Sequence, residues 1–244
     1  MKDFKVIDLL PIKWFGDRRE YESSGVRVIT VALNPSDLEF RKNDKETCRT
    51  SLRFPDYNPE DKSTLEQALN SYFRNNPLGW FKQGFEPILG GMGVSYFSGS
   101  RTQRALHTDF CTWYATDPTW SRPTDMKNAK MDLFEQGNKE WLELVDELRP
   151  DIMIFSIPGS YVDKLKIDTE VFVSIDKTQS GQARKKPRII RKGIYKNALC
   201  IFGTTVNTPF GDISAEEKNK LGRKIMAEYA RLKNKGNNIP VIQK

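Results

Sequence analysis

Five short runs of apolar, often β-branched residues constrain the fold of this chain more than any other feature of its sequence. The first run, VITVAL at residues 28–33, is continuous and ends at Asn34-Pro35. Such a run, followed by a turn, is typical of a strand that is buried on both faces. Four further runs are bounded by Pro, Gly or polar residues, and they cover residues 104–111, 151–157, 170–175 and 198–204. We therefore expect five strands.

Helical patterns lie between these runs. Ser63 and Glu66, three positions apart, predict a capping box at the start of one helix. Ser214 and Glu217 predict a second capping box, at the start of the last helix. Strands that alternate with helices predict a mostly parallel sheet with helices on both faces. We expect a single α/β domain over residues 1–244, built as a three-layer αβα sandwich around a central sheet of four to five strands.

The positive charge of the chain is concentrated in one segment. The sequence holds 39 Lys and Arg against 32 Asp and Glu, a formal net charge of +7, yet residues 177–211 contain no acidic residue. Residues 177–196 are polar and interrupted by Gly and Pro, which predicts a loop or a projecting hairpin. Uncompensated positive charge favours nucleic acid as a partner, with an acidic protein as the alternative. The basic residues are Lys177, Arg184, Lys185, Lys186, Arg188, Arg191, Lys192 and Lys196.

The cysteines and the hydropathy pattern exclude several classes of protein. Cys48, Cys111 and Cys200 stand far apart and are odd in number, which argues against a disulfide framework, a structural zinc and an iron–sulfur cluster. No apolar run approaches the ~20 residues of a membrane span. We expect a cytoplasmic, monomeric protein that uses no metal, no other cofactor and no membrane.

Polar residues follow three of the expected strands. The sequence continues as NPSD after residue 33, as HTD at residues 107–109, and as TTVNTPFG at residues 204–211. In a parallel α/β sheet, ligands bind at the carboxyl ends of the strands. We therefore expect these three segments to form one pocket.

The stretch ALNPS, placed after a buried first strand, resembles the first motif of the uracil-DNA glycosylase superfamily, in its branches with Asn-Pro. The resemblance extends in order over residues 26–213 and implies the fold of that superfamily. It implies that Phe54 stacks on a flipped base, that His107 or Asp109 reads the base edge, and that TVNTPFG is the final DNA-contacting loop. That loop lacks its usual histidine, and three cysteines are too few for the branches with an iron–sulfur cluster.

The chemistry of N-glycosidic hydrolysis suggests a role for several of these residues. The Asn34 side-chain oxygen can orient a water molecule, Asp37 or Asp109 is the alternative general base, and Asn207 is the nearest donor for the departing base. The candidate residues form three groups: catalytic Asn34, Asp37 and Asn207; base-binding Pro35, Ser36, Phe54, His107 and Asp109; and DNA-binding Lys185, Lys186, Arg188, Arg191, Lys192, Thr208 and Phe210. Because the three segments contain no lysine, we expect an abasic product without strand cleavage.

Two other functions and several structural interpretations compete with this hypothesis. The chain is alternatively a non-catalytic nucleic-acid-binding module of the same fold, or an N-glycosidase for small nucleosides or nucleotides. Asn34-Pro35 alone is a common way to end a strand, Phe54 is equally a core residue, and His107 is equally a satisfied interior side chain. The missing histidine and the polar residues 41–62 favour a substrate beyond uracil. The superfamily includes anti-phage glycosylases that remove glucosylated hydroxymethylcytosine, and we expect this chain to be similar to those, because a bulky sugar-bearing base would need extra room and a polar lining.

Overall fold

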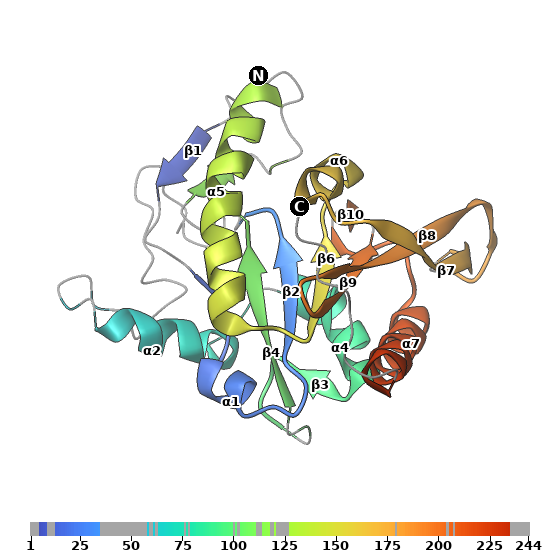
Figure 1. Cartoon of the computed structure of the whole chain (residues 1–244), viewed down its shortest axis with the longest axis horizontal. Helices are drawn as coiled ribbons and strands as arrows, with labels where there is room; N and C mark the ends of the chain where they lie inside the picture. The colour runs from blue at the N-terminus through green and yellow to red at the C-terminus, as the bar shows by residue number, and fades with distance from the viewer. Residues whose placement is uncertain are drawn as a thin grey trace. The chain divides into compact units, whose positions relative to one another are not determined.

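Seven strands form one sheet in the computed structural model of the chain (Figure 1). Strand β8 is antiparallel to both of its neighbours, while β3 is parallel to β4 and β6 is parallel to β9. The sheet is therefore mostly parallel, with an antiparallel hairpin at one edge. Its order is β3 (Val94–Ser95), β4 (Gln103–Asp109), β2 (Val28–Ala32), β6 (Ile152–Ser156), β9 (Ala198–Gly203), β8 (Ala183–Tyr195) and β7 (Thr169–Lys177).

The structure describes residues 5–8, 13–34, 58, 61, 63–75, 77, 79–99, 101, 103–110, 114–117, 120, 127–178, 180–203, 205–206 and 208–234. Within them the α/β class is confirmed, and each of the five apolar runs overlaps a strand. Every residue of β2 and β6 is buried, as a continuous apolar run predicts. The expected four to five strands were too few, because the two-residue β3 and the basic β8 also belong to the sheet.

The chain divides into two compact units, and β2 and β4 contribute residues to both. The first unit comprises residues 1–22, 31–78 and 106–149. Its helices are α1 (Arg18–Glu22), α2 (Thr64–Ser71), the 3-10 helix η3 (Tyr72–Arg74) and α5 (Lys127–Leu148), and β1 (Lys5–Asp8) pairs with β5 (Tyr114–Asp117). The single domain over residues 1–244 stays a prediction.

Aromatic rings join α5 to the end of β4 in the first unit. The ring centroid of Phe110 lies 4.4 Å from that of Trp141 and 5.0 Å from that of Phe134. Trp141 also donates its indole N–H to Thr108 Oγ1 at 3.0 Å. These contacts hold the last residues of β4 against the helix.

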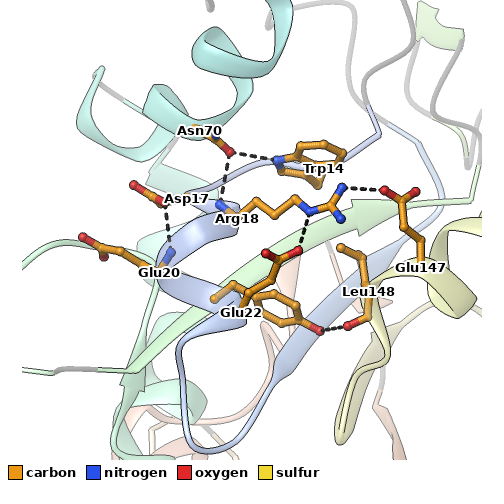
Figure 2. A network of polar contacts seen from close by, with 9 residues as sticks. Trp14, Asp17, Arg18, Glu20, Glu22, Asn70, Glu147 and Leu148 are labelled. Atoms are coloured by element: carbon orange, nitrogen blue, oxygen red, sulfur yellow. Dashed lines mark hydrogen bonds and ion pairs between the residues drawn. The ribbon is translucent and has the colours of Figure 1, made fainter.

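A polar network ties the short helix α1 to α2 and α5 (Figure 2). Arg18 Nε donates to Glu22 at 2.7 Å, and its Nη1 donates to Glu147 of α5 at 2.5 Å. The Asn70 side-chain oxygen of α2 accepts from the Arg18 backbone N–H at 3.1 Å and from the Trp14 indole at 3.3 Å. The network explains how a helix of five residues is held in place.

The second unit comprises residues 23–30, 79–105 and 150–244. Its helices are α3 (Gly79–Gln83), α4 (Glu86–Met92), α6 (Gly159–Val162), the 3-10 helix η4 (Asp163–Leu165) and α7 (Ala215–Asn234). Helices α4 and α7 cross at glycines, since a Cβ added at Gly222 would lie 2.0 Å from the Ile88 carbonyl oxygen. A larger residue at this crossing would push the helices apart.

The two predicted capping boxes have different outcomes. Ser214 Oγ accepts the Glu217 backbone N–H at 3.2 Å, so the start of α7 is confirmed. Ser63 makes no such bond, and the prediction of a cap there was wrong, because its hydroxyl donates to Asp61 at 2.6 Å instead. None of the described helices is long and apolar enough to span a membrane.

Candidate functional site

Two of the three polar segments lie at neighbouring strand ends in the first unit. Strand β2 ends at Ala32, and β4 ends at Asp109. The backbone N–H of Phe110 donates to the Ala32 carbonyl oxygen at 3.2 Å, so the two strands finish at the same level (Figure 1). Asn34 follows β2 by two residues and is half-buried. The structure therefore brings Asn34 and the HTD segment to one edge of the sheet.

His107 and Asp109 form a buried pair on one face of β4, since alternate strand residues point the same way. Their side chains are 2% and 4% exposed, and His107 Nε2 lies 3.5 Å from Asp109 Oδ1. Thr108 points the opposite way, toward Trp141 of α5. The backbones of His107 and Phe15 exchange two N–H···O hydrogen bonds, of 2.8 and 3.0 Å. The backbone of β4 thus fixes both side chains.

Asp109 has an acceptor that the described residues leave unused. Its Oδ1 is buried and accepts no hydrogen bond from any residue that the structure describes. An unsatisfied buried acceptor costs about 1–3 kcal/mol, and more when it is charged. A water molecule or a ligand donor at this oxygen would remove that penalty, so Asp109 is suited to receive a proton or to bind an N–H group.

Several predicted site residues fall outside the described residues. Pro35, Ser36, Asp37 and Phe54 belong to the stretch 35–57, and Asn207 lies between the described residues 206 and 208. Their roles stay predictions. The expected common pocket of the three segments also stays a prediction, because the third segment belongs to the second unit.

The third segment forms a small hairpin after β9. Strands β10 (Thr205–Val206) and β11 (Thr208–Pro209) pair with Thr205 opposite Pro209 and Val206 opposite Thr208. Asn207 joins the paired residues Val206 and Thr208 in sequence, and Thr208 is half-buried.

Phe210 anchors this hairpin in the core and does not point to solvent. Its side chain is 0% exposed, and its ring lies 6.2 Å from that of Phe85. A Cβ added at Gly203 would lie 2.0 Å from the Phe210 ring, so this glycine makes room for it. The prediction of Phe210 as a DNA contact is therefore corrected: in this conformation the ring fills the protein interior.

The predicted DNA-binding cations lie on the hairpin of β7 and β8, and carboxylates neutralise two of the five. Arg188 Nε donates to Asp212, which Arg184 Nη1 also approaches to 3.5 Å. Lys192 Nζ lies 2.7 Å from Glu228 and 3.0 Å from Glu170. Lys185, Lys186 and Arg191 are exposed, and no described carboxylate pairs with them.

The ion pairs of Lys192 change the titration of their members. Burial alone lowers the pKa of Lys192, but its hydrogen bonds to Glu228 and Glu170 raise the pKa above its ordinary value. Hydrogen bonds from Arg231 first, and then from Lys192, lower the pKa of Glu228 to about 2. Lys192 and Glu228 therefore both stay charged over the neutral range. These partners lie outside residues 177–211, the stretch without acidic residues, and Asp212 is the next residue, so the charge of that stretch alone does not reveal them.

Two hollows in the described structure contain none of the predicted site residues. One lies in the first unit, and its lining includes Glu66 and Asn70 of α2 and Arg74 of η3. The other lies in the second unit beside Asp151, Tyr229 and Lys233, where the Tyr229 hydroxyl donates to Asp151 at 2.8 Å. No group of three or more His, Cys, Asp or Glu suited to a metal occurs among the described residues. A scan against protein-family models and a search of curated proteins find no match to this sequence.

Proposed function

We propose that the chain is a monofunctional DNA glycosylase with the αβα sandwich of the uracil-DNA glycosylase superfamily. It flips uracil or a modified cytosine, including glucosylated hydroxymethylcytosine, out of DNA and hydrolyses the N-glycosidic bond, in repair or in anti-phage defence. The observation that carries this proposal is the edge where β2 and β4 end together, with Asn34 after one strand and the buried His107–Asp109 pair on the other.

The proposed reaction needs no metal or other cofactor. The C1′–N bond breaks, its electron pair leaves with the base, and the sugar becomes an oxocarbenium-like cation. The side-chain oxygen of Asn34 orients a water molecule, whose oxygen forms the new bond to C1′. The water proton passes to a carboxylate or to the departing base. The product is free base and an abasic site.

Asp109 supports this chemistry in one of two ways. As a carboxylate whose Oδ1 accepts no hydrogen bond from the described residues, it can take the proton of the attacking water. Alternatively it accepts an N–H of the flipped base and so selects the base. In both roles the atom that acts is Asp109 Oδ1, which lies 3.5 Å from His107 Nε2 in the buried pair.

A base-release assay tests the proposal. Duplexes and single strands that contain uracil, hydroxymethylcytosine or its glucosylated form are incubated with the protein, and alkali-labile sites are counted. We expect cleavage of at least one substrate only after alkali treatment, and loss of that cleavage in Asp109→Asn. Asp132→Asn, an exposed carboxylate on α5, is the matched control and should retain activity.

The same assay separates the alternatives. A non-catalytic DNA-binding module would bind these duplexes and leave no alkali-labile site in any of them. A small-molecule N-glycosidase would release base from nucleosides or nucleotides and leave DNA intact. Either result would overturn the proposed reaction.

A further inference from the structure

The part of β8 before Arg191 extends beyond β9 and pairs only with β7 among the described residues (Figure 1). Here Ile175 lies opposite Arg188, Ser174 opposite Ile189, and Val173 opposite Ile190. A two-stranded ribbon therefore continues where the wider sheet ends. We call residues 171–177 and 183–191 the ribbon.

The two faces of the ribbon differ in chemistry. One face is covered by protein: Ile190 and Ile175 are buried, and Arg188 is held by Asp212. The opposite face carries Ile189 and Arg191, with Val171 across from Arg191. Val171 is 58% exposed and Ile189 is 39% exposed, and they are the exposed large hydrophobic residues of the described chain. We call this face the outer face.

The basic residues of the ribbon fall into two groups, those with a carboxylate partner and those without one among the described residues. Lys192 is paired with Glu228, while Arg184 and Arg188 share the single carboxylate of Asp212, so these three cations are partly neutralised. Lys185, Lys186 and Arg191 are exposed and have no carboxylate partner among the described residues; Arg191 donates only to Thr169, at 3.0 Å. The exposed cations of the ribbon that no described carboxylate pairs with are therefore these three residues and Lys177, the last residue of β7.

We infer that the ribbon binds double-stranded DNA, with Lys185, Lys186 and Arg191 on phosphates and with Val171 and Ile189 against the groove wall. The inference rests on the proposed function for the nature of the ligand. A two-stranded ribbon fits the ~12 Å width of the major groove. The six residue steps from Lys185 to Arg191 span about 20 Å, which is the length of about six base pairs. Charge complementarity and exposed aliphatic groups together match a duplex.

The test measures DNA binding without catalysis. Fluorescence anisotropy of a plain duplex that contains no modified base is recorded between 50 and 200 mM salt for the whole chain. The test variant, called the outer-face variant below, is Lys185→Gln/Lys186→Gln/Arg191→Gln; it removes Arg191 from the outer face together with two exposed charges near the tip of the ribbon. The matched control, Lys127→Gln/Lys139→Gln/Lys224→Gln, removes three exposed charges from α5 and α7. Thermal unfolding of both variants checks that they are folded.

We expect the outer-face variant to bind more weakly and the slope of log K against log salt to become shallower by about 2–3, because each released phosphate contact removes ~0.9. The control should match the wild type. A second variant, Val171→Ser/Ile189→Ser, should weaken binding with an unchanged salt slope. Equal effects of the outer-face variant and its control, or no effect of either, would overturn the inference.

A competition experiment addresses an acidic protein segment as the alternative ligand. Polyglutamate at the same concentration of negative charge should displace the duplex far less well than unlabelled duplex does. Equal displacement would show a general polyanion surface and would also overturn the inference. Since none of these measurements depends on base excision, they stand apart from the test of the proposed reaction.

Discussion

Removing the ring of Phe210 tests how the final hairpin is held at the end of β9. The side chain is fully buried against Phe85 and Gly203. Truncating a fully buried Phe to Ala costs about 3–5 kcal/mol. For a chain of this size, 1 kcal/mol lowers the melting temperature by about 2–4 °C. Phe210→Ala should therefore lower the melting temperature by about 6–20 °C.

The same contact predicts a strong coupling between Phe210 and Gly203. In Gly203→Ala the new methyl group would lie 2.0 Å from the ring, so the variant should lose about 1–3 kcal/mol by overpacking. In the double variant the methyl group occupies space that the ring has left. We expect the double variant to be more stable than the sum of the single losses predicts, by about 1–3 kcal/mol.

Urea unfolding followed by circular dichroism measures all three free energies. Gly159→Ala is the matched control, because a Cβ added there meets no atom within 4 Å. Strictly additive losses in the double-mutant cycle would refute the packing of Phe210 on Gly203. A Phe210→Ala variant as stable as the wild type would refute the burial of the ring.

Three further predictions concern the second unit. Gly222→Ala should lower the free energy of unfolding in urea by about 1–3 kcal/mol, since its methyl group would meet the Ile88 carbonyl of α4. An unchanged free energy of unfolding would contradict the close helix crossing. The pKa of Glu228 is about 2 in the folded chain and ordinarily 4.5, so its ion pairs stabilise the fold above pH 4.5 and this stability is lost as the pH falls toward 2. Glu228→Gln should therefore be less stable at pH 7 and show a flatter acid dependence between pH 4.5 and 2, and an unchanged pH profile would count against the ion pairs. Burial raises the pKa of the Cys200 thiol far above its ordinary value. In a Cys48→Ser/Cys111→Ser variant, no thiol should therefore react with Ellman's reagent until urea unfolds the chain. Rapid labelling of the folded protein would contradict the burial of Cys200.

The apolar runs allowed much of the sheet to be predicted. Strand β6 is a continuous apolar run in the sequence and is fully buried, so its pattern is unambiguous. Strand β8 lies in the segment that the sequence predicts as a loop or a projecting hairpin, and it was not counted among the strands of the sheet, because basic residues occur on both of its faces and no alternation of polar and apolar residues marks it. Its backbone hydrogen bonds to β7 and β9 place it in the sheet. Such pairing cannot be read from side-chain periodicity.

The candidate site was predictable only where strand ends define it. The positions of Asn34 and Asp109 follow from the ends of two buried strands, and the structure agrees with the expected edge. Phe210 was predicted to contact DNA because it lies in a polar loop, but the small residue Gly203 leaves space for its ring in the protein interior. The partners of Arg188 and Lys192 were missed because ion pairs form across long sequence separations.

In the proposed reaction Asn34 directs water onto a glycosidic bond in DNA. Mass spectrometry of the base released in single-turnover reactions tests it most directly, with Asn34→Ala compared to Asn128→Ala, an exposed asparagine on α5. We expect free base and an abasic strand with wild type and Asn128→Ala, and release at least about 100-fold slower with a folded Asn34→Ala protein. Equal rates of release by the two variants would contradict this role of Asn34.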